Sequence, residues 1–179
     1  MSHLLVGIEG VAPGAVAAPS PDHDLPDRDL PDRDLPDHDL IALARRIGDV
    51  HAEGVLLVGR AALAVAAGDR AGGAAQLLAA LELGRRRNLW YIEELALIAT
   101  VMLAGATGRP DDAARLHGGL VELLPRIERT IAPDMMEVYR GAVDRARRSL
   151  GDDRFEQAVA LGRLLEWEEV TDLAAAVCD

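Results

Sequence analysis

The stretch LARRIGDVHAEGVLLVGRAALAVAAG, residues 43–68, decides the fold because it recurs along the chain. Residues 83–108, LGRRRNLWYIEELALIATVMLAGATG, align with it without a gap at an offset of 40. Both copies keep a leucine, an Arg-Arg pair, a glutamate and a closing glycine, and a polar turn and a further Ala-rich segment follow each copy. A period of about 40 residues with two helices in each unit is typical of an α-solenoid.

Apolar residues follow the helical period of 3.6 in and after the second copy, which predicts helices rather than strands. The chain is also rich in Leu and Ala and has only 3% aromatic residues, a composition that favours closely packed helices. We therefore expect an all-α fold, an α-solenoid of antiparallel helix pairs with about six to seven helices and a partial leading one. The apolar stripes are Tyr91, Leu95, Ile98 and Met102; Ala113, Leu116, Leu120, Leu123 and Ile127; and Met136, Tyr139, Val143, Ala146 and Leu150.

Glycine and proline punctuate these helices. Gly68 and Gly108 stand where we expect a helix to end in the left-handed conformation. Pro110 and Pro133 stand at expected helix starts, where the N–H that proline lacks would have no partner within the helix. Further glycines fall inside the expected helices, where each costs about 1 kcal/mol relative to alanine. Hinges would explain them, but close contact between helices is the favoured interpretation. These glycines are Gly54, Gly59, Gly84, Gly118 and Gly119.

An acidic cap is expected at the start of the helix that contains Phe155. Either Asp152 or Asp153 can supply it, and Glu156 stands three residues after Asp153 as in a capping box.

Residues 1–39 are expected to be disordered, and residues 40–179 to form the helical domain. The unit Asp-x-Asp-Leu-Pro repeats over 22–40, and its prolines exclude a helix or a central strand. His23 and His38 among the aspartates suggest a hard-cation site, but the glycine and glutamate of an EF-hand loop are missing. We interpret the run as a solvated acidic linker, with no metal.

Charge and composition limit which classes of binding partner and which cellular compartment we expect. The formal net charge is −11, of which residues 22–39 carry −6, so the helical domain is only mildly acidic. This gives no reason to expect a nucleic acid or an anionic membrane as partner. Residues 1–21 end like a signal peptide, but Glu9 interrupts their apolar run and no Lys or Arg precedes it. With the single Cys178 excluding an intrachain disulfide, we expect a cytoplasmic protein.

The segments GRPDDAARLHGGLVELL and APDMMEVYRGAVDRARRSLGDDRFEQAVALGRLLEWEEVTDLAAAV carry a family resemblance. They resemble the C-terminal tetratricopeptide-like repeat region of actinobacterial LuxR-type STAND ATPase transcriptional regulators and of related cyclase-linked regulators, over about residues 40–178. The resemblance implies a tetratricopeptide-like solenoid that acts in signal-responsive transcription control. The matching residues are Gly108, Arg109, Pro110, Ala113 to Leu116, Pro133, Tyr139, Leu150, Gly151, Phe155, Gly162, Arg163, Glu168 and Glu169.

The sequence also departs from that family. It contains no lysine, so a standard P-loop is impossible. Glu166 stands where the family has a Ser or Thr cap, and glutamate caps poorly. The chain stops at Asp179, where a LuxR-type DNA reader would begin, so we expect either a stand-alone protein or a detached part of a larger regulator.

The sequence offers no catalytic constellation. His51 and His117 lie on different expected helices without a Ser, Cys or second His at a motif spacing, and Cys178 has no evident base. Adjacent acids such as Glu168 and Glu169 diverge on a helix. We expect a protein that is not an enzyme and uses no cofactor, although an enzyme with an unrecognised site stays open as an alternative.

A binding role remains. The first helix of each repeat lines the concave surface of a solenoid, which makes His51, Trp90, Tyr91 and Glu94 the candidates for an interaction groove. Tyr91 also fits a core stripe, so a core role is at least as good an interpretation for it. The expected partner is a protein or a second copy of the chain, because a short solenoid exposes an apolar end. The alternative is a small-molecule sensor with an inducer in the concave groove.

Overall fold

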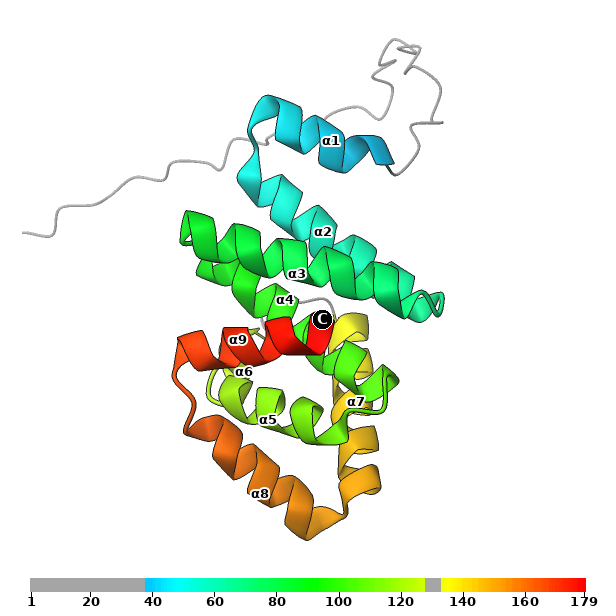
Figure 1. Ribbon diagram of the computed structural model, residues 1–179, viewed down its shortest axis with the longest axis vertical. Coiled ribbons are helices and arrows are strands. Elements are labelled where there is room, and N and C mark those ends of the chain that lie inside the picture. Colours follow the sequence, from blue (N-terminus) through cyan, green and yellow to red (C-terminus); the bar gives the residue numbers. More distant parts are fainter. Residues whose placement is uncertain (1–37, 128–132) are drawn as a thin grey trace, which may run out of the picture. The chain divides into compact units, whose positions relative to one another are not determined.

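The computed structural model describes residues 38–127 and 133–179, and the regular structure of both ranges is helical throughout (Figure 1). The expected all-α class is therefore confirmed. The predicted disorder of residues 1–39 falls almost wholly outside the described residues. The helices are α1 (His38–Ile47), α2 (Val50–Ala66), α3 (Arg70–Arg87), α4 (Trp90–Ala106), α5 (Pro110–Leu120), α6 (Leu124–Ile127), α7 (Pro133–Leu150), α8 (Asp152–Arg163) and α9 (Trp167–Cys178).

Left-handed residues recur every twenty positions in the first half of the chain. Gly48, Gly68, Asn88 and Gly108 all have positive φ, between 53° and 87°. The predicted helix ends at Gly68 and Gly108 are thus confirmed, and each forty-residue repeat contains two helices separated by a further left-handed turn. Because these turns are short, successive helices become packed neighbours, as α2 and α3 and then α3 and α4 do.

Helix α4 is the centre of the described fold. Its side chains are buried almost all round the helix, including Ile92, Leu97, Val101 and Leu103. Such a helix needs neighbours on every side, and α4 packs against α2, α3, α5, α7 and α9. Residues from both halves of the chain therefore share one core.

The last helix, α9, returns to the middle of the chain. It packs against α3, α4 and α5, and in Figure 1 it lies between α3 and α5, in front of α4. The guanidinium of Arg109 donates to the carbonyls of Ala176 and Val177 at 2.8 and 3.2 Å, and Arg85 donates to the hydroxyl of Thr171 at 2.7 Å. In a simple repeat array each unit contacts only its neighbours in the sequence, so α9 is a departure from that pattern.

Two glycines allow α5 and α8 to cross at backbone contact. A Cβ atom at Gly118 would collide with the carbonyl of Val159, and one at Gly162 would collide with the carbonyl of Arg115. Close helix contact, the favoured interpretation of the interior glycines, also holds at Gly54, Gly84 and Gly119, where an added Cβ would lie under 3 Å from a side chain. It is wrong for Gly59, which has nothing within 4 Å of that position.

Two helix boundaries differ from the expected ones. The stripe over residues 113–127 is not one helix, because α5 ends at Leu120 and α6 begins at Leu124. Pro125 explains the break, since its ring and missing N–H prevent a helix from running through it. The helix that contains Phe155 begins without an aspartate cap, since its N-cap is Gly151 at φ 78°.

The start of α9 also differs from the expected weak cap. Glu166 is the N-cap, and its backbone N–H donates to the Glu169 carboxylate at 2.8 Å. A glutamate three residues inside the helix thus satisfies the donor at its start.

We predict that Gly162→Ala destabilises the protein by about 2–3 kcal/mol, because its new methyl group meets rigid backbone instead of a movable side chain. The matched control is Gly59→Ala, which faces open space and should gain up to about 1 kcal/mol through helix propensity. Urea unfolding followed by circular dichroism measures both. Equal effects of the two substitutions would contradict the backbone crossing of α5 and α8.

Candidate functional site

The first turns of α2 and α4 are brought side by side by their caps and by one glycine. Asp49 caps α2, since its carboxylate accepts from the backbone N–H of Ala52 at 2.9 Å. Asn88, at φ 53°, ends α3 and lets α4 begin two residues later. The two helices then meet where Gly54 faces Ile92, with an added Cβ only 2.8 Å from the isoleucine side chain. The residues just before this contact on each helix become neighbours.

The aromatic face is the set His51, Val55, Trp90 and Tyr91. The rings of His51 and Tyr91 stack with centroids 5.7 Å apart and planes 7° apart, and Trp90 meets Tyr91 edge-on at 6.4 Å. Trp90 is 55% exposed, and Val55, one turn after His51 on α2, is also exposed. Large aromatic surface that remains open to solvent is typical of binding sites.

Glu94 differs from the other three candidates for the interaction groove. It follows Trp90 by one helical turn, but it is only 5% exposed. The structure therefore brings His51, Trp90 and Tyr91 together, with Tyr91 half-buried against the core, and places the Glu94 side chain inside.

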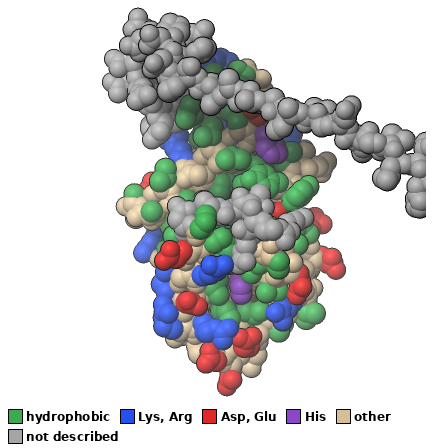
Figure 2. Space-filling model, turned by 180° about the vertical axis from the view of Figure 1, so that it is seen from behind, with side chains coloured by type: hydrophobic (Ala, Val, Ile, Leu, Met, Phe, Trp, Pro, Cys, Tyr) green, Lys and Arg blue, Asp and Glu red, His purple; other side chains and the backbone are tan. Residues whose placement is uncertain are grey.

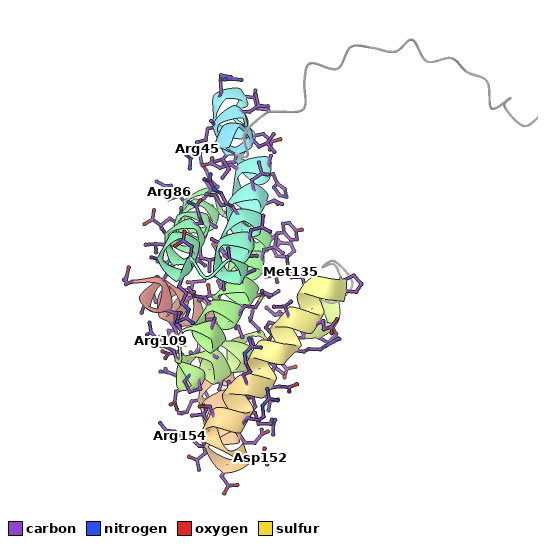
Figure 3. All side chains as sticks on the ribbon, turned by 90° about the vertical axis from the view of Figure 1, so that its right-hand side faces the viewer. Arg45, Arg86, Arg109, Met135, Asp152 and Arg154 are labelled. Carbon is purple, nitrogen blue, oxygen red and sulfur yellow. The ribbon has the colours of Figure 1, made fainter. Side chains whose placement is uncertain are left out.

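Charged side chains gather elsewhere. In Figure 2 red and blue side chains crowd the lower half of the face shown, whereas green and tan atoms predominate among the described residues of its upper half. Arg154 pairs with Asp111 at 2.8 Å, and Asp152 pairs with Arg147 at 3.1 Å; Figure 3 shows Arg154 and Asp152 together at the far end from Arg45. Exposed pairs of this kind contribute about 0–1 kcal/mol each.

A second cluster surrounds His117 on α5. Its Nδ1 lies 2.7 Å from the Tyr139 hydroxyl, and its ring is tilted against that of Phe155 at 6.2 Å. The Arg147 guanidinium lies 4.3 Å from the centre of the Phe155 ring, a cation–π contact. These contacts join α5, α7 and α8.

Beside this cluster is a small pocket of about 120 Å³. Its walls come from α5, α6 and α7 and are largely apolar, and none of the four groove candidates lines it. The lining residues are His117, Leu124, Met136, Tyr139, Arg140, Val143 and Asp144.

Burial lowers the pKa of His117, and the positive charges of Arg163 and Arg147 lower it further, while Glu156 acts in the opposite direction. The imidazole is therefore kept neutral. A neutral ring carries one donor and one acceptor nitrogen, so either His117 Nδ1 accepts from the Tyr139 hydroxyl or the other tautomer donates to it.

Burial also raises the pKa of the Cys178 thiol to about 11, with Thr100 and Arg109 opposing that rise. Since the thiolate is the reactive form, this cysteine is a packing residue at the end of α9.

Within residues 38–127 and 133–179, no group of three or more His, Cys, Asp or Glu could hold a metal ion. No helix of the same ranges is long and apolar enough to cross a membrane. Comparison with known proteins found no matching family model, no matching curated protein and no matching solved structure. The likeness to LuxR-type regulators therefore stays a prediction.

The contacts of α9 and of His117 could not have been found from local patterns. Arg85 belongs to a basic cluster in the last turn of α3, and it donates to Thr171 and Asp172 on α9. The Trp167 indole N–H donates to Glu93, 74 residues away in the sequence. Tyr139 and Phe155 were noticed as family markers, but no spacing connects them to His117.

We predict that acidification weakens folding through His117. The unfolded imidazole takes up a proton near pH 6.5, whereas the folded one does so only at a lower pH. The free energy of unfolding therefore falls as the pH drops through the interval between these two pKa values. In His117→Gln this contribution to the pH dependence is absent, which urea unfolding at pH 7.5 and pH 5.5 measures.

The control for this experiment is Tyr139→Phe, which removes the tyrosine hydroxyl but keeps the titrating imidazole of His117. It should lower stability by about 1 kcal/mol while retaining a wild-type loss on acidification. If His117→Gln lost as much stability on acidification as the wild type, His117 would not be the group responsible for the pH dependence.

We predict that Cys178 reacts with iodoacetamide at pH 8 about a hundredfold more slowly in the folded protein than in urea, because its raised pKa leaves little thiolate. Arg109→Ala removes the hydrogen bonds to the last carbonyls of α9 and should speed the reaction several-fold by fraying that end. Arg154→Ala, which breaks an ion pair on another surface, is the control. Fast alkylation of the folded wild type would contradict the docked position of α9.

Proposed function

We propose that the chain is a non-enzymatic helical-repeat interaction module that binds a protein partner through the aromatic face. The observation that carries this proposal is the 55% exposure of Trp90 beside the stacked rings of His51 and Tyr91. Exposed tryptophan and tyrosine are the side chains that anchor interfaces most strongly.

The arrangement of helices supports the same role. The helices of α2–α3, of α4–α5 and of α7–α8 are in contact, which supports a tetratricopeptide-like solenoid with α9 as an added cover. In such a solenoid the first helices of the pairs line the binding surface. His51 and Tyr91 occupy equivalent positions in the two sequence repeats, and both lie in the first turn of a first helix.

The geometry also suggests what the face can bind. The rings supply flat apolar area with little conformational entropy to lose, since two of them are already held against each other. An amphipathic helix or an apolar loop of the partner fits such a surface. The family resemblance adds a context, a regulatory protein of transcription or signalling in the cytoplasm.

A second candidate function is small-molecule sensing. It is favoured by the pocket of about 120 Å³ beside His117 and Tyr139, whose largely apolar walls carry polar groups at the rim. This pocket is far smaller than typical ligand sites of about 300–1,000 Å³, so protein binding remains the main proposal. A ligand there would be apolar and contain only a few heavy atoms.

The proposal predicts that Trp90→Ala and His51→Ala each reduce the affinity for the physiological partner, with about a tenfold or larger loss for the tryptophan. The partner is first captured from source-cell extract with the full chain and is then titrated against each purified variant. The control is Leu164→Ala, which removes a still more exposed apolar side chain, 78%, beyond α8. Unchanged affinity in Trp90→Ala, or an equal loss in Leu164→Ala, would rule out the aromatic face.

A further inference from the structure

Helix α9 is held by small apolar side chains and by polar contacts. Val170, Ala174 and Val177 are its buried apolar residues, and it packs against α3, α4 and α5, none of which adjoins it in the sequence (Figure 1). Residues 164–166 join it to α8, and Leu164 in this connection is 78% exposed. A terminal helix with few large buried side chains opens more readily than the centre of a core.

The surface under α9 has polar groups that need specific partners. The carboxylate of Glu93, a residue that is only 7% exposed, accepts from the indole N–H of Trp167. Arg85 donates to the Asp172 carboxylate at 2.6 Å, and Arg109 donates to the last carbonyls of α9. Because a buried carboxylate without a donor is costly, this surface needs an occupant that matches these groups.

The same surface also selects its occupant by size. Gly119 on α5 faces Val170, and a Cβ added at Gly119 would lie 2.7 Å from Cγ2 of that valine. The valine fits only because residue 119 has no side chain. We call Arg85, Glu93, Arg109 and Gly119 together the α9 contact surface.

We propose that the α9 contact surface accepts α9 of a second copy of the chain, so that two copies exchange their last helices about a two-fold axis. A second copy supplies the same indole N–H, carboxylate, carbonyls and valine in the same order. The contacts on the surface are therefore retained, and only the connection 164–166 has to change its course. The proposal does not depend on the aromatic face, which lies on α2 and α4.

The exchange requires α9 to leave its own chain first, and association costs translational and rotational entropy. The dimer therefore forms slowly from folded chains, and it forms more readily when chains refold together at high concentration. The experiments below start from full chains that are unfolded in urea and refolded together.

A disulfide between chains tests the exchange directly. A Cβ added at Gly119 lies 3.5 Å from the Val170 Cβ, which is within the separation of about 3.5–4.5 Å in disulfides. Gly119→Cys and Val170→Cys chains are refolded together and oxidised with oxidised glutathione. We expect a covalent dimer with its bond between residues 119 and 170, mapped by mass spectrometry of its peptides.

The matched control replaces Gly119→Cys with Gly59→Cys, which faces open space on α2. A bond between residues 59 and 170 then forms only by random collision of two chains. The bond between residues 119 and 170 should be about tenfold more frequent, because docking of α9 raises the effective concentration of the two thiols.

A charge exchange repeats the test at side chains on which folding depends little, since those of Arg85 and Asp172 are 53% and 62% exposed. Arg85→Asp and Asp172→Arg each place like charges between α3 and α9 of one chain. In an exchanged dimer of the two variants, both surfaces again pair opposite charges. Sedimentation velocity should therefore show several-fold more dimer in the mixture than in either variant alone.

The control for the charge exchange is the double variant Arg85→Asp/Asp172→Arg, which restores the pair within one chain. It should form no more dimer than the wild type.

Two results would overturn the proposal. One is a bond between residues 119 and 170 that is no more frequent than the control bond, which would mean that α9 stays on its own chain. The other is a mixture of the charge variants that contains no more dimer than the separate variants. If circular dichroism shows that Gly119→Cys does not refold, the charge exchange alone decides.

Discussion

The fold depends on the need to cover α4 on every side. This helix is apolar almost all round, and each large side chain that it buries contributes about 1.5–3 kcal/mol relative to exposure. Its neighbours come from both sides of it in the sequence, α2 and α3 before and α5, α7 and α9 after. The buried residues of the described helices therefore form one shared core.

Covering α4 also brings polar groups into the interior, and the structure pairs them. Glu93 is nearly buried on α4, and the indole N–H of Trp167 donates to its carboxylate. A buried carboxylate without a partner would cost several kcal/mol. The contact therefore fixes where α9 lies, and the hydrogen bonds from Arg109 to the last carbonyls of α9 fix its far end. No backbone N–H of α9 donates to these two carbonyls, because they belong to the last turn of the helix.

Features that depend on neighbouring residues could be predicted from the sequence. Gly68 and Gly108 end helices, and Pro110 and Pro133 begin them, because backbone geometry is local. The forty-residue alignment also placed His51 at the position that matches Tyr91, and the two rings stack in the structure. The same alignment sets Gly48 opposite Asn88, and both have positive φ.

Features that join distant segments could not be predicted in this way. In a simple repeat array α9 would lie next to α7 and α8. The sequence of α9 does not predict that Arg85 and Glu93 form hydrogen bonds with this helix. The burial of Glu94, the contact of His117 with Tyr139 and the raised pKa of Cys178 follow from the same long-range packing. The break between α5 and α6 is different, because Pro125 is a local signal for it. The spacing of apolar residues alone does not reveal this break.

Exposed apolar and charged side chains are distributed unevenly over the described helices. At the end formed by α8, charged pairs such as Arg154 with Asp111 lie on the surface, while α9 packs over α3, α4 and α5 in the middle of the described helices. At the end formed by α1, that helix has both buried and exposed apolar side chains. Helices α2 and α4 begin with exposed or stacked rings. The first half of the helical region therefore combines exposed apolar side chains with buried ones, and both halves contribute to the one core beneath them.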